Sequence, residues 1–283
     1  MVDLERFGIS AALLTPFKVD GSVDLRLFAS HAKSVLRRGA SSITIFGTTG
    51  EGASVSPVER LDGLRHLLDS GISPDQILPT IYASALGEAI QQIVDASETG
   101  VTKFLLVPPH YFKGCSDDGL YAWHEDLLRS APRHSKFVLY HIPQVTGVPL
   151  SPSLIARLAE EFSDRLIGIK DSSGDWDNTL NFLDLISVPV LVGDERMLHH
   201  AVARGGAGAI TGMANLYPDR MHRLFQSATE DVELSAEVGR IVVHPVIPAL
   251  KAMLARNSEN ESWERVRAPL EPLDAQARSA LGL

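Results

Sequence analysis

Short apolar segments recur along the chain, and longer stretches with helical periodicity separate them. Eight such segments are rich in aliphatic and β-branched residues, and they begin at Ile9, Ser42, Ile77, Lys103, Lys136, Leu166, Pro189 and Ala207. Near-continuous apolar runs of this kind are typical of strands that are buried on both faces, as in a parallel sheet. We therefore predict eight buried strands.

The stretches between these strands carry the start and stop signals of helices. We expect helices over residues 24–38, 57–69, 88–98, 118–130, 152–161, 176–186 and 195–204. Ser56-Pro57 and Ser151-Pro152 each offer a capping hydroxyl before a proline at the first helical position. Glycine, which closes a helix in the left-handed conformation, follows four of these stretches, at Gly39, Gly71, Gly100 and Gly205.

Regular alternation of strand and helix predicts βαβ units, and eight units predict a single (β/α)8 TIM barrel. No polar linker divides the chain, which favours one structural domain. We expect the barrel core over residues 1–217, and the last barrel helix with a C-terminal helical extension over 218–283. Within this extension, residues 242–254 are strongly apolar and predict a helix, and residues 256–261 predict a polar turn.

Composition excludes several classes of partner. The 283 residues carry a formal net charge of −9 and no run of Lys or Arg, so we expect no nucleic-acid partner. The one cysteine, Cys115, cannot form an internal disulfide, which favours a cytoplasmic location. The first ten residues show no signal-peptide pattern and no 18-residue apolar run occurs, so we expect no membrane association.

Lys170 is the first candidate for chemistry, because working residues of such barrels lie at the C-terminal ends of the strands. It follows the apolar run Leu166–Ile169, where an unpaired ammonium costs several kcal/mol. Burial favours the neutral amine, which can attack a ketone and form an imine. Alternatively, Lys170 pairs with a carboxylate of a neighbouring strand or extends past the strand end.

Two further sites accompany this lysine. The glycine-rich turn over residues 47–52 offers the hydroxyls of Thr48 and Thr49 and several backbone N–H groups before a helix N-terminus, an arrangement suited to a carboxylate. Alternatively, this turn is only a tight strand-to-helix connection and binds no ligand. Tyr140 lies near the end of the fifth strand, beside the strand of Lys170, where its hydroxyl can transfer protons. Alternatively, Tyr140 is a structural tyrosine, buried with its hydroxyl in a hydrogen bond.

Four motifs occur in order at the ends of successive strands: GTTGE at 47–51, PPHY at 108–111, YHIP at 140–143 and GIKDSS at 168–173. Together they resemble the dihydrodipicolinate synthase/N-acetylneuraminate lyase family of class I aldolases, over essentially the whole chain. The resemblance implies a TIM barrel, a Schiff base between pyruvate and Lys170, and neither a metal nor another cofactor.

The resemblance also implies roles for individual residues. Thr48 and Thr49 would hold the pyruvate carboxylate, Tyr140 would be the proton-transferring hydroxyl, and Gly193 and Ile210 would line the pyruvyl pocket. Tyr111 matches a tyrosine that enters a neighbouring subunit's site and completes a relay, which here would join Thr49, Tyr111 and Tyr140. The relay implies a homo-oligomer, and the family is usually a homotetramer, a dimer of dimers.

Departures from the family pattern bear on the substrate. Val145 stands where dihydrodipicolinate synthases carry an arginine that grips the carboxylate of the aldehyde partner, so a bidentate contact is missing. The region that binds the polyol in N-acetylneuraminate lyases, here residues 194–196 and 211–212, matches only in part. We therefore expect a lyase that reversibly cleaves a 2-keto-3-deoxy acid to pyruvate and an aldehyde.

Several alternatives remain open. The chain could be a dihydrodipicolinate synthase that condenses pyruvate with aspartate semialdehyde, with Arg196 or another cation in place of the missing arginine, or a 2-keto-3-deoxy sugar acid dehydratase. A non-catalytic 2-oxo acid sensor is disfavoured by the intact set of candidate residues. A metal-dependent hydrolase is disfavoured because the ten histidines show no ligand spacing. The adjacent His199 and His200 are expected on different faces of a helix.

Overall fold

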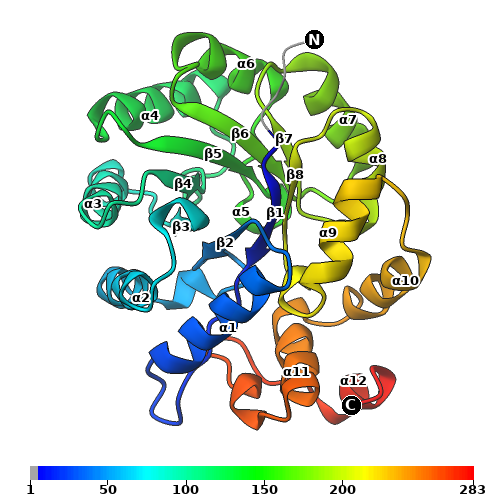
Figure 1. The fold of residues 1–283 in the computed structure, drawn as a ribbon. Helices are drawn as coiled ribbons and strands as arrows, with labels where there is room; N and C mark the ends of the chain where they lie inside the picture. The colour runs from blue at the N-terminus through cyan, green and yellow to red at the C-terminus, as the bar shows by residue number, and fades with distance from the viewer. Residues whose placement is uncertain (1–5) are drawn as a thin grey trace.

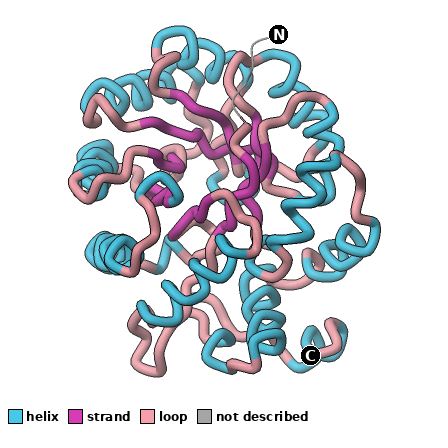
Figure 2. Tube along the Cα trace, viewed as in Figure 1, coloured by secondary structure: helices cyan, strands magenta, loops and turns pink. Residues whose placement is uncertain are grey.

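The computed structural model describes residues 6–283, so half of the ten-residue N-terminal segment considered above lies outside the described residues. Eight parallel strands pair in chain order, and β1 pairs with β8 to close the barrel. Figures 1 and 2 show the strands surrounded by helices. The predicted TIM barrel is confirmed. The strands are β1 Gly8–Ala12, β2 Ser42–Ile45, β3 Ile77–Ile81, β4 Lys103–Leu106, β5 Lys136–His141, β6 Leu166–Asp171, β7 Val190–Val192 and β8 Gly208–Thr211.

The helices that cover the barrel agree with six of the seven predicted stretches to within two residues. The exception is the stretch 195–204, which forms a 3-10 turn followed by a short helix. The α-helices are α1 Leu25–Arg37, α2 Pro57–Asp69, α3 Leu86–Ser97, α4 Asp117–Ser130, α5 Pro143–Thr146, α6 Pro152–Glu161, α7 Trp176–Leu185, α8 Leu198–Ala203, α9 Pro218–Ser227, α10 Val232–Ile241, α11 Val246–Ser258 and α12 Ala275–Ala280. The 3-10 helices are η1 Gly52–Ser54, η2 Pro74–Gln76, η3 Glu195–Met197, η4 Met213–Asn215 and η5 Glu261–Glu264.

Local signals explain the helix boundaries. The Ser56 side chain accepts a hydrogen bond from the Glu59 backbone N–H, and the Glu59 carboxylate accepts one from the Ser56 backbone N–H, which completes a capping box. The Ser151 hydroxyl caps α6 through the Leu154 N–H. The four helix-closing glycines have positive φ angles, as predicted.

Side chains alternate between the two faces of each strand, so the apolar residues form two cores. One core lies between the strands and the surrounding helices, and a smaller one fills the barrel interior with residues that include Val138, Tyr140, Leu191 and Ile210. In the strand register Tyr140 is partnered with Lys170, and Lys170 with Leu191. Because partnered residues of parallel strands point to the same face, Lys170 also faces the barrel interior.

The C-terminal region departs from its prediction. The apolar run 242–254 does not form one helix, because α10 ends at Ile241 and α11 begins at Val246 after Pro245. A proline disfavours helical geometry in the residue before it, here His244. Helix α11 then runs to Ser258, so the first half of the expected polar turn 256–261 is helical. Within residues 6–283, no single helix is long and apolar enough to cross a membrane, although α10 and α11 together pass that test with a 120° bend between them.

Helix α11 is anchored to the loop after β2 by a buried ion pair. The Lys251 ammonium contacts the Glu51 carboxylate, and both side chains are fully buried. The second oxygen of Glu51 accepts a hydrogen bond from the Arg267 backbone N–H at 2.9 Å. This pair holds α11 against the loop that follows β2, and Figure 1 shows α11 and α12 below the barrel.

One expectation about α8 is wrong. The rings of His199 and His200 were expected on different faces of the helix, but their centroids are 3.9 Å apart. Both histidines lie within α8, where consecutive positions are about 100° apart around the helix axis, and this separation does not keep two adjacent imidazole rings from contact.

Candidate active site

A cavity of about 270 Å³ opens at the C-terminal ends of the barrel strands. Side chains or backbone from the loop after β2 and from β5, β6, β8 and the loop after β7 line it, and helices α10 and α11 cover one side. Six of the seven residues expected at the site lie around this cavity: Thr48, Thr49, Tyr140, Lys170, Gly193 and Ile210. The seventh, Tyr111, does not.

Lys170 and Tyr140 form the centre of the site. Both are buried, with 5% and 2% of their surface exposed, and the Lys170 Nζ lies 4.0 Å from the centroid of the Tyr140 ring. Burial raises the pKa of Tyr140, but the positive charge of Lys170 and hydrogen bonds to Thr48, Lys170 and Ser172 outweigh it, so that this pKa is lowered overall. A tyrosine with a lowered pKa is a suitable proton acceptor next to an amine.

The two alternatives raised for Lys170 do not describe its surroundings. It is buried within β6 and does not extend past the strand end. Its neighbour Asp171 faces the helices and accepts hydrogen bonds from Asn178 and Thr179 of α7. Within residues 6–283, the lysine whose ammonium is paired with a buried carboxylate is Lys251.

A chain of hydroxyl groups leads away from Tyr140. The Thr48 Oγ1 lies 3.4 Å from the Tyr140 hydroxyl and 3.0 Å from the Tyr82 hydroxyl. The first distance is long for a hydrogen bond between hydroxyls, but catalytic hydrogen bonds often shorten when substrate binds. Thr48 thus contacts both tyrosines.

The relay expected from the resemblance requires a correction at Thr49. Its side chain lies against Gly212, where an added Cβ atom would stand 3.5 Å from the Thr49 Cγ2. The hydroxyl that hydrogen-bonds to Tyr140 belongs to Thr48 instead. Both threonines lie in the turn after β2, and its path directs the Thr48 hydroxyl toward Tyr140 and the Thr49 side chain toward Gly212.

The loop over residues 47–52 is compact because backbone segments approach each other closely. A Cβ atom on Gly52 would lie 1.8 Å from the Phe46 carbonyl oxygen, and one on Gly50 would lie 2.6 Å from the Leu13 carbonyl oxygen. Glu51 adopts the left-handed conformation, with a φ angle of 54°. The loop leads into the short 3-10 helix η1 rather than directly into an α-helix, which corrects the expectation of a helix N-terminus at this point.

Close approach also explains Gly193. A Cβ atom at this position would lie 2.0 Å from the Ser172 Oγ, so any larger residue would displace Ser172 from the cavity wall. Glu195 lies nearby with its carboxylate buried, in contact with the Thr211 hydroxyl and 2.9 Å from the Met213 backbone nitrogen. Burial raises the pKa of Glu195, although these hydrogen bonds oppose that effect.

Tyr111 lies outside the cavity of its own chain. It is 77% exposed and its ring contacts the equally exposed Phe112, with 5.2 Å between the centroids. The loop is held by hydrogen bonds from the His110 and Tyr111 backbone N–H groups to the Ser84 hydroxyl. Tyr111 therefore cannot complete a relay within this subunit.

The cavity contains few cations. Lys170 is the one Lys or Arg among the described residues that line it, whereas Asp194 and Glu195 supply two carboxyl groups. Val145, at the position of the missing arginine, is 55% exposed and is not among the lining residues, although its neighbour Gln144 is. The guanidinium of Arg196 is held by Asp194 through two hydrogen bonds of 3.0 and 2.6 Å, so it does not replace that arginine.

The side of the cavity formed by the C-terminal helices is apolar. It consists of Val238, Ile241, Val242, Val246 and Leu250. The lining also includes Ser172 and Gln144, whose amide donates a hydrogen bond of 2.5 Å to the Ser172 carbonyl. A molecule bound next to Lys170 would thus meet both hydrogen-bonding and aliphatic groups.

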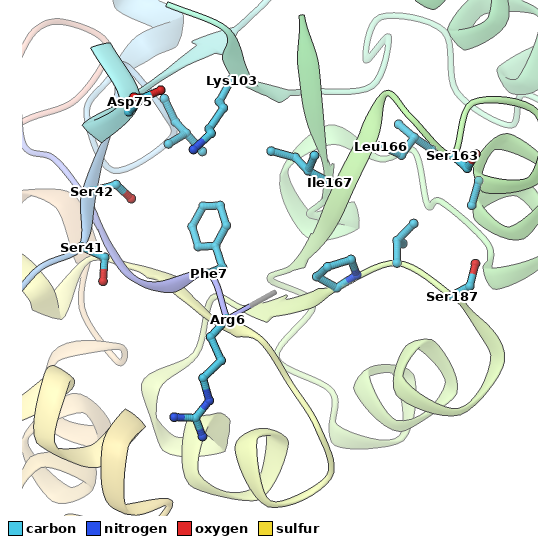
Figure 3. A pocket seen from close by; sticks show the side chains of 14 residues that line it. Arg6, Phe7, Ser41, Ser42, Asp75, Lys103, Ser163, Leu166, Ile167 and Ser187 are labelled. Carbon is cyan, nitrogen blue, oxygen red and sulfur yellow. The ribbon is translucent and has the colours of Figure 1, made fainter. Parts of the chain in front are cut away.

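A second cavity lies at the opposite end of the barrel. Its volume is about 430 Å³, and its lining includes Phe7, Ser42, Lys103 and Leu166, near the N-terminal ends of the strands (Figure 3). In barrels of this type that end contributes to stability rather than catalysis. It contains none of the candidate residues.

No individual role was expected for four polar residues in or beside the cavity, Tyr82, Gln144, Ser172 and Glu195, although Ser172 belongs to the GIKDSS motif and Glu195 lies within residues 194–196. Ser172 and Gln144 follow β6 and β5, so their places after strand ends were a usable signal. Tyr82 directly follows β3 and has the same signal, but no recognised motif contains it.

Comparisons with known proteins agree with this geometry. Residues 5–282 match the model of the dihydrodipicolinate synthetase family. A DapA-like lyase of Chloroflexus aurantiacus is 33% identical, with 97% of this chain and 94% of the relative covered. A 4-hydroxy-tetrahydrodipicolinate synthase of an Anaeromyxobacter species is 32% identical, with coverages of 78% and 74%.

Solved structures show the same architecture. The crystal structure of dihydrodipicolinate synthase from Agrobacterium tumefaciens is 38% identical, with a TM-score of 0.94 and coverages of 98% of this chain and 97% of that one. The chloride-inhibited dihydrodipicolinate synthase from Acinetobacter baumannii, complexed with pyruvate, is 26% identical, with a TM-score of 0.87 and coverages of 97% and 96%.

Proposed function

This chain belongs to the dihydrodipicolinate synthetase family and is a class I lyase, and we propose that it reversibly cleaves a 2-keto-3-deoxy acid to pyruvate and an aldehyde. The observation that carries this proposal is the buried amine of Lys170 beside the Tyr140 ring, inside the cavity. The pyruvate complex of the Acinetobacter baumannii relative supports a 2-oxo acid as the bound group.

The reaction begins with attack of the Lys170 amine on the C2 carbonyl of the substrate. Loss of water gives a protonated imine, which accepts the electron pair of the C3–C4 bond when that bond breaks. Tyr140 takes the proton of the C4 hydroxyl, and the aldehyde leaves. The resulting enamine is protonated at C3, and hydrolysis of the imine releases pyruvate and restores the amine.

Residues around Lys170 hold the pyruvyl part. We assign the carboxylate to the loop containing Thr48 and Thr49, whose backbone N–H groups and hydroxyls suit an anion. The absence of a side chain at Gly193 lets Ser172 stay in the cavity wall, and Ile210 supplies an apolar part of that wall. None of these steps needs a metal or another cofactor, because the imine itself is the electron acceptor.

The charges of the cavity favour an aldehyde without a carboxylate. With Lys170 used for the imine, the described lining residues offer no second Lys or Arg, and the guanidinium of the nearby Arg196 is already paired with Asp194. Gln144 and Ser172 can instead hydrogen-bond to hydroxyl groups of the aldehyde part. These features support a 2-keto-3-deoxy acid whose aldehyde fragment is uncharged.

A second candidate is 4-hydroxy-tetrahydrodipicolinate synthase, which condenses pyruvate with aspartate semialdehyde. The names of several relatives, including the Anaeromyxobacter protein, favour it. The exposed Val145 and the Asp194-paired Arg196 count against it, because neither can grip the second carboxylate. A dehydratase would use the same imine but would retain every carbon atom of the substrate.

The test is a panel of 2-keto-3-deoxy acids scored by pyruvate release, beside a coupled assay with pyruvate and aspartate semialdehyde. The proposal predicts pyruvate and aldehyde in equal amounts from at least one acid, and turnover with aspartate semialdehyde at least tenfold lower in kcat/KM. Faster turnover with aspartate semialdehyde would establish the synthase. A product that keeps all carbon atoms would establish the dehydratase.

We further propose that the protein is a cytoplasmic homotetramer, a dimer of dimers. The exposed aromatic pair of Tyr111 and Phe112 supports a contact between subunits at the loop after β4, because adjacent exposed aromatic side chains are enriched at interfaces. The free Cys115 supports a reducing compartment. Sedimentation analysis of the wild type and of a Tyr111→Ser/Phe112→Ser variant tests the contact.

A further inference from the structure

The C-terminal helices present aliphatic side chains to the active-site cavity. Val238 and Ile241 are three positions apart on α10, and Val242 directly follows them. Val246 and Leu250 are four positions apart on α11. Residues three or four positions apart lie on the same side of a helix, and all five of these residues line the cavity. We call them the aliphatic wall.

Exposure divides the aliphatic wall into two parts. Val238, Ile241 and Leu250 are at most 2% exposed and belong to the core between the strands and the helices. Val242 and Val246 are 42% and 40% exposed, although both line the cavity. An apolar group bound in the cavity would remove part of the surface of these two valines from water, which is favourable.

The carboxyl groups that line the cavity are already engaged within the chain. Asp194 accepts hydrogen bonds from the Arg196 backbone nitrogen and from the Arg196 guanidinium, and both of its oxygens take part. Glu195 contacts the Thr211 hydroxyl and accepts a hydrogen bond from the Met213 backbone nitrogen at 2.9 Å. A polyol would have to compete with these contacts, whereas an aliphatic chain would leave them in place.

The remaining polar groups suit the oxygen at C4 of the substrate. The Ser172 side chain hydrogen-bonds to Tyr140, the group that would take the C4 hydroxyl proton. Gln144 donates its amide nitrogen to the Ser172 carbonyl, so it lies beside the same place. Beyond C4, a substrate that extends toward α10 and α11 would meet the aliphatic wall.

We propose that the group carried by C4 of the substrate is a short aliphatic chain that packs against the aliphatic wall. The substrate class is then a 4-hydroxy-2-oxo acid with an alkyl tail, and not a sugar acid with hydroxyl groups at C5 and C6. This inference rests on the proposed function, because cleavage of the C3–C4 bond by the same proton and electron movements releases pyruvate and an alkanal. Val242 and Val246 are the residues that select the tail.

A series of acids with increasing tail length measures this preference. 4-Hydroxy-2-oxopentanoate, 4-hydroxy-2-oxohexanoate and 4-hydroxy-2-oxoheptanoate carry a methyl, an ethyl and a propyl group at C4. We expect kcat/KM for pyruvate release to rise about fourfold with each methylene, the value for burial of one CH2 group. The rise shows whether the tail is buried in an apolar place.

Two deoxy sugar acids provide the polar comparison. 2-Keto-3-deoxygluconate and its C4 epimer have the same number of carbon atoms as 4-hydroxy-2-oxohexanoate, and they add hydroxyl groups at C5 and C6. We expect their kcat/KM to be about tenfold lower or less, because hydroxyl groups against aliphatic side chains lose hydrogen bonds to water. Use of both epimers covers both configurations at C4.

A double variant tests the aliphatic wall itself. Val242→Thr/Val246→Thr keeps the shape of both side chains and adds two hydroxyl groups at half-exposed positions. We expect kcat/KM to fall about fivefold with 4-hydroxy-2-oxoheptanoate and to stay within twofold with 4-hydroxy-2-oxopentanoate, whose methyl group covers less of the wall. The borohydride-trapped pyruvate adduct should be unchanged, because pyruvate has no tail.

The matched control changes two valines of the same region that do not line the cavity. Val232 and Val243 are 68% and 74% exposed, so Val232→Thr/Val243→Thr adds the same two hydroxyl groups outside the site. We expect its dependence on tail length to equal that of wild type. Melting temperatures show that both variants are folded, and the series of acids with the wild type decides the matter if the Val242→Thr/Val246→Thr variant does not fold.

The outcomes separate this inference from the proposed function. Faster cleavage of either deoxy sugar acid than of 4-hydroxy-2-oxohexanoate overturns the inference and leaves the lyase reaction in place. A flat dependence on tail length, or an equal loss with every acid in Val242→Thr/Val246→Thr, overturns it as well. Absence of pyruvate release from every acid of the panel rejects the proposed function itself.

Discussion

The Lys170 Nζ lies 4.0 Å from the centroid of the Tyr140 ring, and the two residues are register partners on neighbouring strands. Strand pairing fixes this relationship, because partnered residues of parallel strands share a face and a height in the barrel. A loop could not hold an amine and a phenol so rigidly. The position of the amine and that of the proton acceptor are thus set by the sheet itself.

Replacement of Tyr140 by phenylalanine separates imine formation from bond cleavage. We expect kcat for pyruvate release to fall 100-fold or more, because the C4 hydroxyl loses its proton acceptor. The pyruvate adduct trapped by borohydride should still form. Steady-state kinetics and intact mass measurements check the two parts, and retention of normal kcat would show that another group accepts the proton.

A new arginine at Val145 should change the preference for the aldehyde. Val145 is 55% exposed on the short helix α5, so the substitution has room and little effect on stability is expected. A bidentate contact with a carboxylate adds about 1.5 to 3 kcal/mol, and we expect kcat/KM with aspartate semialdehyde to rise at least tenfold. Val145→Gln, which has no charge, is the control. An equal gain in both variants would contradict the electrostatic explanation.

The buried pair of Lys251 and Glu51 should be sensitive to the loss of either partner. Lys251→Met leaves the Glu51 carboxylate buried beside an uncharged side chain, and we expect a loss of about 3 to 5 kcal/mol in the free energy of unfolding. The double variant Glu51→Gln/Lys251→Met removes the uncompensated charge and should be more stable than Lys251→Met alone. Denaturant unfolding checks both, and a loss below about 1 kcal/mol in Lys251→Met would refute the role of the pair.

Two buried histidines should make the free energy of unfolding fall in acid. Burial lowers the pKa of both His31 and His124 to about 4, although hydrogen bonds to Asn215 and to the Leu120 carbonyl act in the other direction. Their pKa in the unfolded chain is about 6.5, so between pH 6.5 and 4 the unfolded chain binds more protons than the folded one. The free energy of unfolding therefore falls as the pH drops through this window.

The effect can be measured at one of these sites. Between pH 7.5 and 5.0 each histidine should remove about 2 kcal/mol from the free energy of unfolding. His124→Phe keeps roughly the size of the ring and removes the proton site, and the Nε2 of His124 has no hydrogen-bond partner among residues 6–283. We expect this variant to lose about 2 kcal/mol less than wild type over the same pH range. Equal losses would contradict burial of a neutral His124.

Much of the fold follows from apolar periodicity. The predicted strand starts agree with the structure to within one residue, because strands buried on both faces need continuous apolar runs. The break between α10 and α11 was missed, although Pro245 was a usable signal for it. The positions of Lys170 and Tyr140 also followed from the sequence, since both lie at the ends of consecutive strands.

Finer features of the site depended on side-chain direction. The sequence could not decide which of Thr48 and Thr49 faces Tyr140, because the path of the loop is set by the close packing of Gly50 and Gly52 against neighbouring backbone. The contact of the Tyr82 hydroxyl with Thr48 was not predicted, because it joins residues 34 positions apart that follow different strands. Such contacts appear only once the barrel has closed.

Borohydride reduction of the protein with pyruvate, followed by peptide mass mapping, tests the central claim most directly. The account predicts one reduced pyruvyl adduct per chain, located on Lys170, and neither adduct nor pyruvate release in Lys170→Ala. An adduct on another lysine, or normal turnover by Lys170→Ala, would contradict it.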